Sequence, residues 1–236
     1  DTEIYFLSNQ KDAARSETIS FRVDGKAPEL WWPETGRVDR EPPFTASDGR
    51  VSVPVDFDIH TSVFVVFREA VDIQERKAPE RVAPVVHAEL DGPWTVAFPF
   101  GEEPFMQLTS WTEHEKEDIK YFSGEAVYRN TFTAPEAREG VVLHLGEVND
   151  LAVVRVNGQE LGTLWMYPYK IDISAALKDG ENTLEITVVN PWKNRLAGDA
   201  RDDVKSAGTF TSQKVIKADA DLKPAGLLGP VRVLVD

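Results

Sequence analysis

Two short stretches of the chain carry the residue types that bind carbohydrates. Sugars present apolar C–H faces and polar edges, so a binding site pairs an aromatic platform with hydrogen-bonding side chains. The segment "LWMYPYK" places Trp165, Tyr167 and Tyr169 at alternate positions. If this segment is extended, the alternation puts the three rings on one side. The same rings could instead fill a sandwich core or cover its end, because aromatic side chains are more often core than ligand platforms.

The second stretch is "NPWKNRLAGD", residues 190–199, where an apolar strand pattern stops at Pro191. In a structural interpretation, Trp192 covers the core edge, and Arg195 pairs with Asp199 through charge-assisted hydrogen bonds. In a functional interpretation, this stretch faces a sugar or a further domain. Both interpretations stay open. The hypothetical carbohydrate-binding set is Trp165, Tyr167, Tyr169, Trp192, Asn194, Arg195 and Asp199.

A pair of adjacent tryptophans, Trp31 and Trp32 in "ELWWPETG", suggests a contact with another domain. In a strand, neighbouring side chains face opposite ways, so one ring is expected in the core and the other outside it. Large exposed aromatic side chains mark interfaces. Trp31 and Trp32 are therefore the candidates for an interdomain contact.

Residue types suited to catalysis or metal binding occur without a distinguishing pattern. The segment "WTEHEKEDIK" gathers Glu113, His114, Glu115, Glu117 and Asp118, and "GDARDD" holds Asp199, Asp202 and Asp203. A charge run is usually a solvated loop, and neither segment has the ligand spacing of a calcium loop. Glycoside hydrolysis needs two carboxylates roughly 5–10 Å apart, and no such pair is marked among the 40 acidic residues. The sequence therefore predicts no catalytic residue, no metal site and no cofactor.

Composition narrows the classes of partner. The net charge of −14 argues against nucleic acid, because that affinity depends on Lys and Arg neutralising phosphates. The same charge disfavours an anionic membrane surface, and no apolar run approaches the roughly 20 residues that span a bilayer. The chain has no cysteine, which excludes thiol chemistry and disulfides. Neutral ligands such as sugars remain open.

The elements that must position these residues follow a period of two. In "ETISFRV", Ile19, Phe21 and Val23 share one face, and "RVSVPVDFD" alternates in the same way. Pro54 cannot donate to a ladder, which predicts an edge strand there. The segment "TSVFVVFR" is apolar on both faces and predicts a fully buried strand.

The charged, proline-containing segment "ERKAPERVAP", residues 75–84, predicts a linker. Several short strands follow it, and Asn157-Gly158 is a strong hairpin signal. The only predicted helical turn is "DISAALKDG". The predicted fold class is all-β, with two antiparallel β-sandwiches: a β-sandwich domain at residues 1–78 and a second domain at residues 79–236.

The second domain resembles the sugar-binding, galactose-binding-like jelly roll of glycoside hydrolase family 2. The resemblance rests on "YFSGEAVYRNTF", on the run from "LHLGEVNDLAVVRVNG" to "ITVVNPW", and on the closing "GLLGPVRVLVD". The stretch "NRLAGD" is similar to the C-terminal end of glycoside hydrolase family 106, the α-L-rhamnosidases. The first-domain segments "ISFRVDGKAPELWWPETGRV" and "FDIHTSVFVVFRE" resemble the module before that jelly roll, although Trp32 stands where a polar residue is expected.

The resemblance implies a parent enzyme that hydrolyses terminal α-L-rhamnosides in a large (β/α) barrel. The catalytic glutamates and the calcium site of that family belong to its barrel, so no matching positions exist in this chain. We expect non-catalytic accessory domains that brace the barrel and contribute to carbohydrate binding; the alternative is an autonomous carbohydrate-binding module. The opening "DTEIYFLSNQ" already follows a strand pattern, which suggests a piece of a longer protein. The implied location is the bacterial periplasm or cell exterior.

Overall fold

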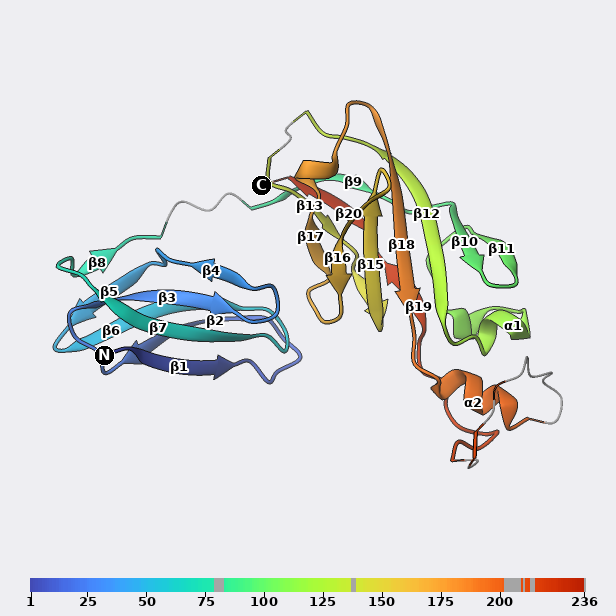
Figure 1. Ribbon diagram of the computed structural model, residues 1–236, viewed down its shortest axis with the longest axis horizontal. Coiled ribbons are helices and arrows are strands. Elements are labelled where there is room, and N and C mark those ends of the chain that lie inside the picture. Colours follow the sequence, from blue (N-terminus) through green and yellow to red (C-terminus); the bar gives the residue numbers. More distant parts are fainter. Residues whose placement is uncertain (79–82, 137–138, 202–208, 210, 213–214, 236) are drawn as a thin grey trace. The chain divides into compact units, whose positions relative to one another are not determined.

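The computed structural model describes residues 1–78, 83–136, 139–201, 209, 211–212 and 215–235. Within them the chain forms two compact units, Asp1–Ala83 and Pro84–Asp236 (Figure 1). Each unit has its own hydrophobic core. The described elements are antiparallel strands with a few short helices, which confirms the all-β expectation. The division lies within the predicted linker, slightly beyond the predicted boundary at residue 78.

The first unit is a sandwich of two four-stranded sheets, β1-β7-β3-β4 and β2-β6-β5-β8. Apolar side chains at alternate positions fill the space between the sheets, among them Phe21, Val53, Val65 and Phe67. The strands are β1 (Glu3–Ser8), β2 (Arg15–Phe21), β3 (Lys26–Trp32), β4 (Arg37–Asp39), β5 (Phe44–Ser47), β6 (Arg50–Phe57), β7 (Ser62–Ala70) and β8 (Glu75–Arg76).

Two sequence predictions about the first unit are wrong. The strand that contains Pro54 is not an edge strand, because β6 lies between β2 and β5. Pro54 is tolerated because β5 pairs with β6 only at residues 50–52, so the missing N–H removes no bond to β5. The predicted linker also begins too early, since Glu75 and Arg76 form β8 beside β5. The predicted buried strand is β7, in which Val63, Val65, Val66 and Phe67 are buried.

The second unit contains a six-stranded sheet, β11-β10-β12-β18-β15-β16, a four-stranded sheet, β17-β13-β20-β9, and the pair β14-β19. One continuous core joins them, with Trp94, Trp111 and Tyr128 as its largest side chains. The strands are β9 (Val85–Glu89), β10 (Trp94–Phe98), β11 (Gly101–Phe105), β12 (Glu125–Thr133), β13 (Val141–His144), β14 (Glu147–Asn149), β15 (Leu151–Val156), β16 (Gln159–Leu164), β17 (Lys170–Asp172), β18 (Glu181–Val189), β19 (Gly226–Gly229) and β20 (Arg232–Val235).

In the second unit the predicted hairpin turn is present, but the structure contains more helices than the sequence predicted. Asn157 and Gly158 take positive φ values of 52° and 80° between β15 and β16, which confirms the hairpin. The predicted helical turn is the 3-10 helix η2 (Ser174–Ala176). Contrary to prediction it is not alone. The structure also contains η1 (Trp111–Glu113), α1 (Glu117–Lys120) and α2 (Lys193–Asp199).

Candidate carbohydrate-binding rim

The antiparallel register gathers four chain segments at one end of the six-stranded sheet. Leu151 pairs with Val189 where β15 begins and β18 ends, and Glu125 pairs with Val189 where β12 begins. Leu164, the last residue of β16, lies opposite Ala152 on the same side. We call the segments 165–169 and 190–199 the rim, because both leave the sheet at this end. Figure 1 shows α2 beyond the end of β18.

The aromatic segment of the rim bends, so the premise of a common extended face for its three rings is wrong. Residues 165–169 form no strand between β16 and β17. The Tyr169 hydroxyl donates to the Asp150 carbonyl at 2.8 Å, and the Tyr169 carbonyl accepts from the Leu145 amide at 2.9 Å. Burial, followed by the charge of Asp150, raises the pKa of Tyr169. Tyr169 thus anchors the loop, Tyr167 is half-buried, and Trp165 is 61% exposed.

The stretch predicted as a loop at residues 193–199 is a helix. Leu196 and Ala200 donate their amides to the carbonyls of Trp192 and Leu196. Asn194, Ala197 and Gly198 form its buried face, at the three- and four-residue spacing that defines one side of a helix. A Cβ at Gly198 would lie 2.7 Å from the Tyr121 ring, so glycine allows the helix to approach that ring. The spacing of these small residues is the signal that could have identified the helix.

Asn194 is buried and bound to the backbone. Its side-chain amide donates to the Lys223 carbonyl at 2.7 Å, and its oxygen accepts from the Lys223 amide at 2.8 Å. Asn190, which the sequence did not mark as a site residue, makes an equivalent pair of hydrogen bonds. Its side-chain amide donates to the Phe122 carbonyl, and its side-chain oxygen accepts from the Gly124 amide. These two asparagines fasten the rim to neighbouring segments, so the contacts that Asn194 makes here are structural.

Arg195 and Asp199 form the ion pair of the structural interpretation, but within the described residues neither buried carboxylate oxygen of Asp199 accepts a hydrogen bond, so the predicted charge-assisted hydrogen bonds are not seen there. The Arg195 Nε lies 2.9 Å from the Asp199 Oδ1, and the two side chains are 13% and 17% exposed. The same Nε donates to the Thr209 hydroxyl at 3.2 Å. An i,i+4 ion pair of this kind stabilises a short helix by about 0.2–0.5 kcal/mol.

Trp192 does not cover the core edge, which corrects that part of the structural interpretation. Its side chain is 60% exposed, and it is absent from the core of the second unit. The rim therefore presents two exposed tryptophans, Trp165 and Trp192, on a frame held by buried polar contacts. Rigid aromatic side chains on such a frame are suited to stacking against a sugar face. The binding role of the seven predicted residues stays a prediction.

Replacing Trp192 with alanine should change the free energy of unfolding by less than about 0.5 kcal/mol, because the exposed ring buries little surface. Asn194→Ala in the same helix should cost about 1–3 kcal/mol, since it leaves a buried carbonyl and amide unpaired. Urea unfolding of both variants measures the difference. A larger loss for Trp192→Ala than for Asn194→Ala would restore the view that Trp192 closes the core.

A polar cluster that the sequence did not reveal supports the sheet near the rim. The Trp111 indole N–H donates to the Tyr128 hydroxyl at 2.5 Å, and the Leu227 amide donates to the same oxygen at 3.1 Å. The Ser110 hydroxyl accepts from the Ala225 amide at 3.0 Å. A Cβ at Gly226 would lie 2.6 Å from the Tyr128 hydroxyl, so glycine is required for this approach. The cluster joins β12 and β19 to the segment before α1.

The two predicted interdomain tryptophans lie on opposite faces of β3. Trp32 packs against the core of the first unit, and the Arg37 guanidinium lies 5.1 Å above its ring. Trp31 points to the outer face, where its indole N–H donates to Glu29 at 2.8 Å. Their contact with another domain stays a prediction, and the outer position makes Trp31 the better candidate.

The acidic segments show no metal site within the described residues. No group of three or more His, Asp or Glu side chains suited to a metal ion occurs there. Around residues 113–118, His114 lies against the Phe105 ring, and Lys116 pairs with Glu103. Asp202 and Asp203 lie outside the described residues. Where the structure describes the chain, no helix combines the length and apolarity needed to cross a membrane.

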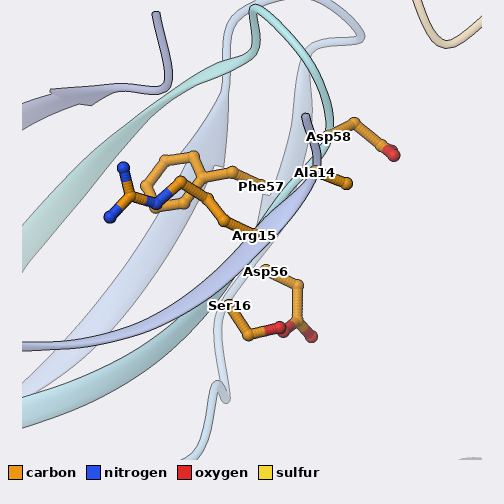
Figure 2. Close-up of a pocket in the computed structure, with 6 residues that line it drawn as sticks. All are labelled: Ala14, Arg15, Ser16, Asp56, Phe57 and Asp58. Atoms are coloured by element: carbon orange, nitrogen blue, oxygen red, sulfur yellow. The ribbon is translucent and has the colours of Figure 1, made fainter. Parts of the chain in front are cut away.

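A hollow of about 320 Å³ lies in the first unit, where the start of β2 meets the end of β6 (Figure 2). Its polar groups are engaged with neighbours: the Ser16 hydroxyl donates to Asp56 at 2.6 Å, and Arg15 pairs with Glu17. Figure 2 shows the Asp58 carboxylate pointing away from Ser16 and Asp56. These side chains do not converge on one point, so the hollow offers no set of groups for catalysis.

Comparison with known proteins gives the context of both units. A family model described as glycosyl hydrolase 2 galactose-binding domain-like matches residues 102–221, and one described as alpha-L-rhamnosidase matches residues 1–42. A solved rhamnosidase structure from Novosphingobium sp. PP1Y covers 98% of this chain, with 41% identity and a TM-score of 0.90. A relative from Formosa agariphila named "Putative beta-glucuronidase" is 35% identical over an alignment of 178 residues and covers 62% of this chain. This chain spans 22% of the rhamnosidase and 15% of the second relative.

Proposed function

Because this chain belongs to the glycosyl hydrolase 2 galactose-binding domain-like family, we propose that it forms accessory β-domains of a larger glycoside hydrolase. The carrying observation is the match to the rhamnosidase, which extends over both units of this chain but over only a small part of that enzyme. The proposed activity of the whole protein is hydrolysis of α-L-rhamnosides. The chemistry belongs to a catalytic domain outside these 236 residues.

The two units then have distinct tasks. The sandwich of the first unit supplies a rigid body that braces the catalytic domain. The rim of the second unit carries Trp165 and Trp192 on a fixed frame, and this arrangement supports contact with the carbohydrate chain outside the catalytic centre. The parent enzyme is proposed to be bacterial and to act in the periplasm or outside the cell, where polysaccharides are found.

An activity assay tests this function. The 236-residue chain alone should leave an aryl α-L-rhamnoside intact, whereas the complete protein that contains it should cleave that substrate. Cleavage by the isolated chain would refute the accessory role, because the active site would then lie within it. A complete protein that cleaves a β-glucuronide and leaves the rhamnoside intact would refute the proposed substrate and keep the accessory role.

A second candidate function, an autonomous carbohydrate-binding module, is favoured by the two exposed tryptophans of the rim. Calorimetric titration of the folded chain with rhamnose-containing oligosaccharides separates the two candidates. Saturable binding that is lost in both Trp165→Ala and Trp192→Ala would support the module. Absence of binding by a folded chain leaves bracing of the catalytic domain as the function.

A further inference from the structure

One outer face of the first unit carries a continuous apolar row. The register places Phe6 opposite Phe64, Phe64 opposite Trp31, and Trp31 opposite Val38, across all four strands of the sheet β1-β7-β3-β4. Their side chains point away from the core, since none of the four belongs to the core cluster of this unit. The Phe6 and Phe64 rings are in contact, with centroids 5.0 Å apart.

The neighbouring row extends this surface. Ile4 lies opposite Val66, two residues along each strand and therefore on the same face. Ile4 is 61% exposed, Phe6 59% and Val38 39%. We call the five residues Ile4, Phe6, Trp31, Val38 and Phe64 the apolar face. Trp31 and Phe64 are half-buried between the exposed residues, and Val66 beside them is only 1% exposed and is not part of this surface. Contiguous exposed apolar side chains of this kind mark interaction sites in soluble proteins.

The other outer face of the same sandwich is polar. On the sheet β2-β6-β5-β8, the outward side chains pair as Ser16 with Asp56, Thr18 with Pro54 and Ser20 with Ser52. These positions alternate with the buried valines of β6, so they face solvent in this structure. The two faces of one small sandwich thus differ in chemistry. This asymmetry indicates that only the sheet with the apolar face is built to be covered.

A hydrogen-bonded cluster of Glu29, Trp31 and Arg68 lies within the apolar face. The Glu29 side chain is 6% exposed although it lies on the outer side of β3, and it accepts from Trp31 Nε1 at 2.8 Å and from Arg68 Nε at 2.8 Å. Burial opposes the charge of Glu29, but the hydrogen bonds from Arg68 and Trp31 keep its pKa below the ordinary value. The Arg68 guanidinium lies 5.7 Å from the Trp31 ring. Preorganised Trp and Arg side chains are typical anchors of protein interfaces.

We infer that the apolar face docks the first unit against the catalytic portion of the parent glycoside hydrolase. This inference rests on the proposed function. A protein built like the matched rhamnosidase has about four fifths of its length outside this chain, so a large intramolecular partner is at hand. A second copy is disfavoured by the net charge of −14, because two such chains repel. A sugar is disfavoured because Phe, Ile and Val side chains dominate the face, and they offer no polar partner for hydroxyl groups.

Hydroxyl-radical footprinting of side chains tests the contact directly. Oxidation of Phe6 and Trp31 should be at least about fivefold slower in the complete protein than in the isolated 236-residue chain, because the core of an interface excludes solvent. Equal oxidation in both proteins would overturn the inference. The readout does not depend on activity: a protected Phe6 in a protein that cleaves no rhamnoside would overturn the proposed substrate and leave the docking contact standing.

A matched pair of variants completes the test. Phe6→Asp should abolish the protection of Trp31 in the complete protein, while lowering the melting temperature of the isolated chain only slightly, since Phe6 is 59% exposed there and loses only its contact with the Phe64 ring. Thr18→Asp introduces the same charge on the polar face and should preserve the protection. Equal loss of protection in both variants would overturn the inference. Protection of Trp31 in the isolated chain that increases with protein concentration would overturn the inference in favour of a second copy. Protection that appears only when an oligosaccharide is added would overturn it in favour of a sugar.

Discussion

Replacing Gly146 with alanine should destabilise the Pro84–Asp236 unit by about 3 kcal/mol or more, because the new methyl group has no space. Gly146 lies between β13 and β14 and forms a bridge with Gly229. A Cβ at residue 146 would lie 2.2 Å from the carbonyl carbon and oxygen of Gly229. Both contact atoms belong to the backbone, so no side-chain rotation can relieve the overlap, and the pairing of β14 with β19 must open.

Gly158→Ala is the matched control for Gly146→Ala. Gly158 also has a positive φ, 80° against 69° for Gly146, but no atom lies within 4 Å of the Cβ position that it would gain. Its replacement should therefore cost only the left-handed backbone strain, about 1–2 kcal/mol. Urea unfolding followed by tryptophan fluorescence measures both variants, since four of the six tryptophans belong to this unit. Equal losses would show that backbone strain, and not the contact with Gly229, makes Gly146 necessary.

The strands of both units could be predicted from the sequence because their apolar residues alternate. Ala126, Tyr128 and Phe132 are buried as the pattern of β12 predicts, and the valines of β6 are buried in the same way. A period of two records which side chains face a core, so it also predicts the sandwich class. The turn at Asn157-Gly158 was predictable because both positions need a positive φ.

The position of a strand within its sheet is a property of other segments, and the sequence does not carry it locally. Pro54 indicated an edge strand, yet β6 lies between β2 and β5. Proline is tolerated in this inner strand because the short β5 pairs only with residues 50–52 and does not extend to Pro54. The helix α2 was missed for a related reason. It is seven residues long, too short to be stable alone, and its formation depends on contacts with Tyr121 and Lys223.

The candidate site shows the same limit. Trp192 and Asn194 have the residue types of a sugar site, but the sequence cannot distinguish an amide that binds a ligand from one that binds the backbone. In the structure the Asn194 side-chain amide is hydrogen-bonded to the backbone carbonyl of Lys223, which lies 29 positions away in the chain, while Trp192 remains exposed. Which side chains remain available to a ligand is decided by such long-range pairs. The prediction for Trp165 and Trp192 therefore gains support from their exposure, and the prediction for Asn194 does not.

Replacing Tyr128 with phenylalanine should destabilise the Pro84–Asp236 unit by about 2–4 kcal/mol, because it leaves two buried hydrogen-bond donors without their acceptor. The hydroxyl of Tyr128 accepts from the Trp111 indole and from the Leu227 amide, and Tyr128 and Trp111 are fully buried. Phenylalanine keeps the ring and its packing, so the loss isolates the hydrogen bonds. Tyr169→Phe removes a single bond to the Asp150 carbonyl near the surface and should cost about 1 kcal/mol. Equal losses at the two positions would argue against the Tyr128 cluster as a stabilising centre.

The pH dependence of this difference gives Tyr128→Phe a second, independent readout. Burial raises the pKa of Tyr128 above its ordinary value of 10.0, because desolvation of the phenolate outweighs the hydrogen bonds from Leu227 and Trp111. Above about pH 10 the unfolded chain therefore releases a proton that the folded chain retains, and the native protein loses up to about 1.4 kcal/mol of stability per pH unit. The variant has no ionisable group at this position, whereas Tyr169 titrates in both proteins and cancels. The stability gap between the native protein and Tyr128→Phe should thus narrow between about pH 10 and about pH 11, as measured by urea unfolding. A gap that stays constant over this range would show that the Tyr128 hydroxyl ionises as easily in the folded chain as in the unfolded one.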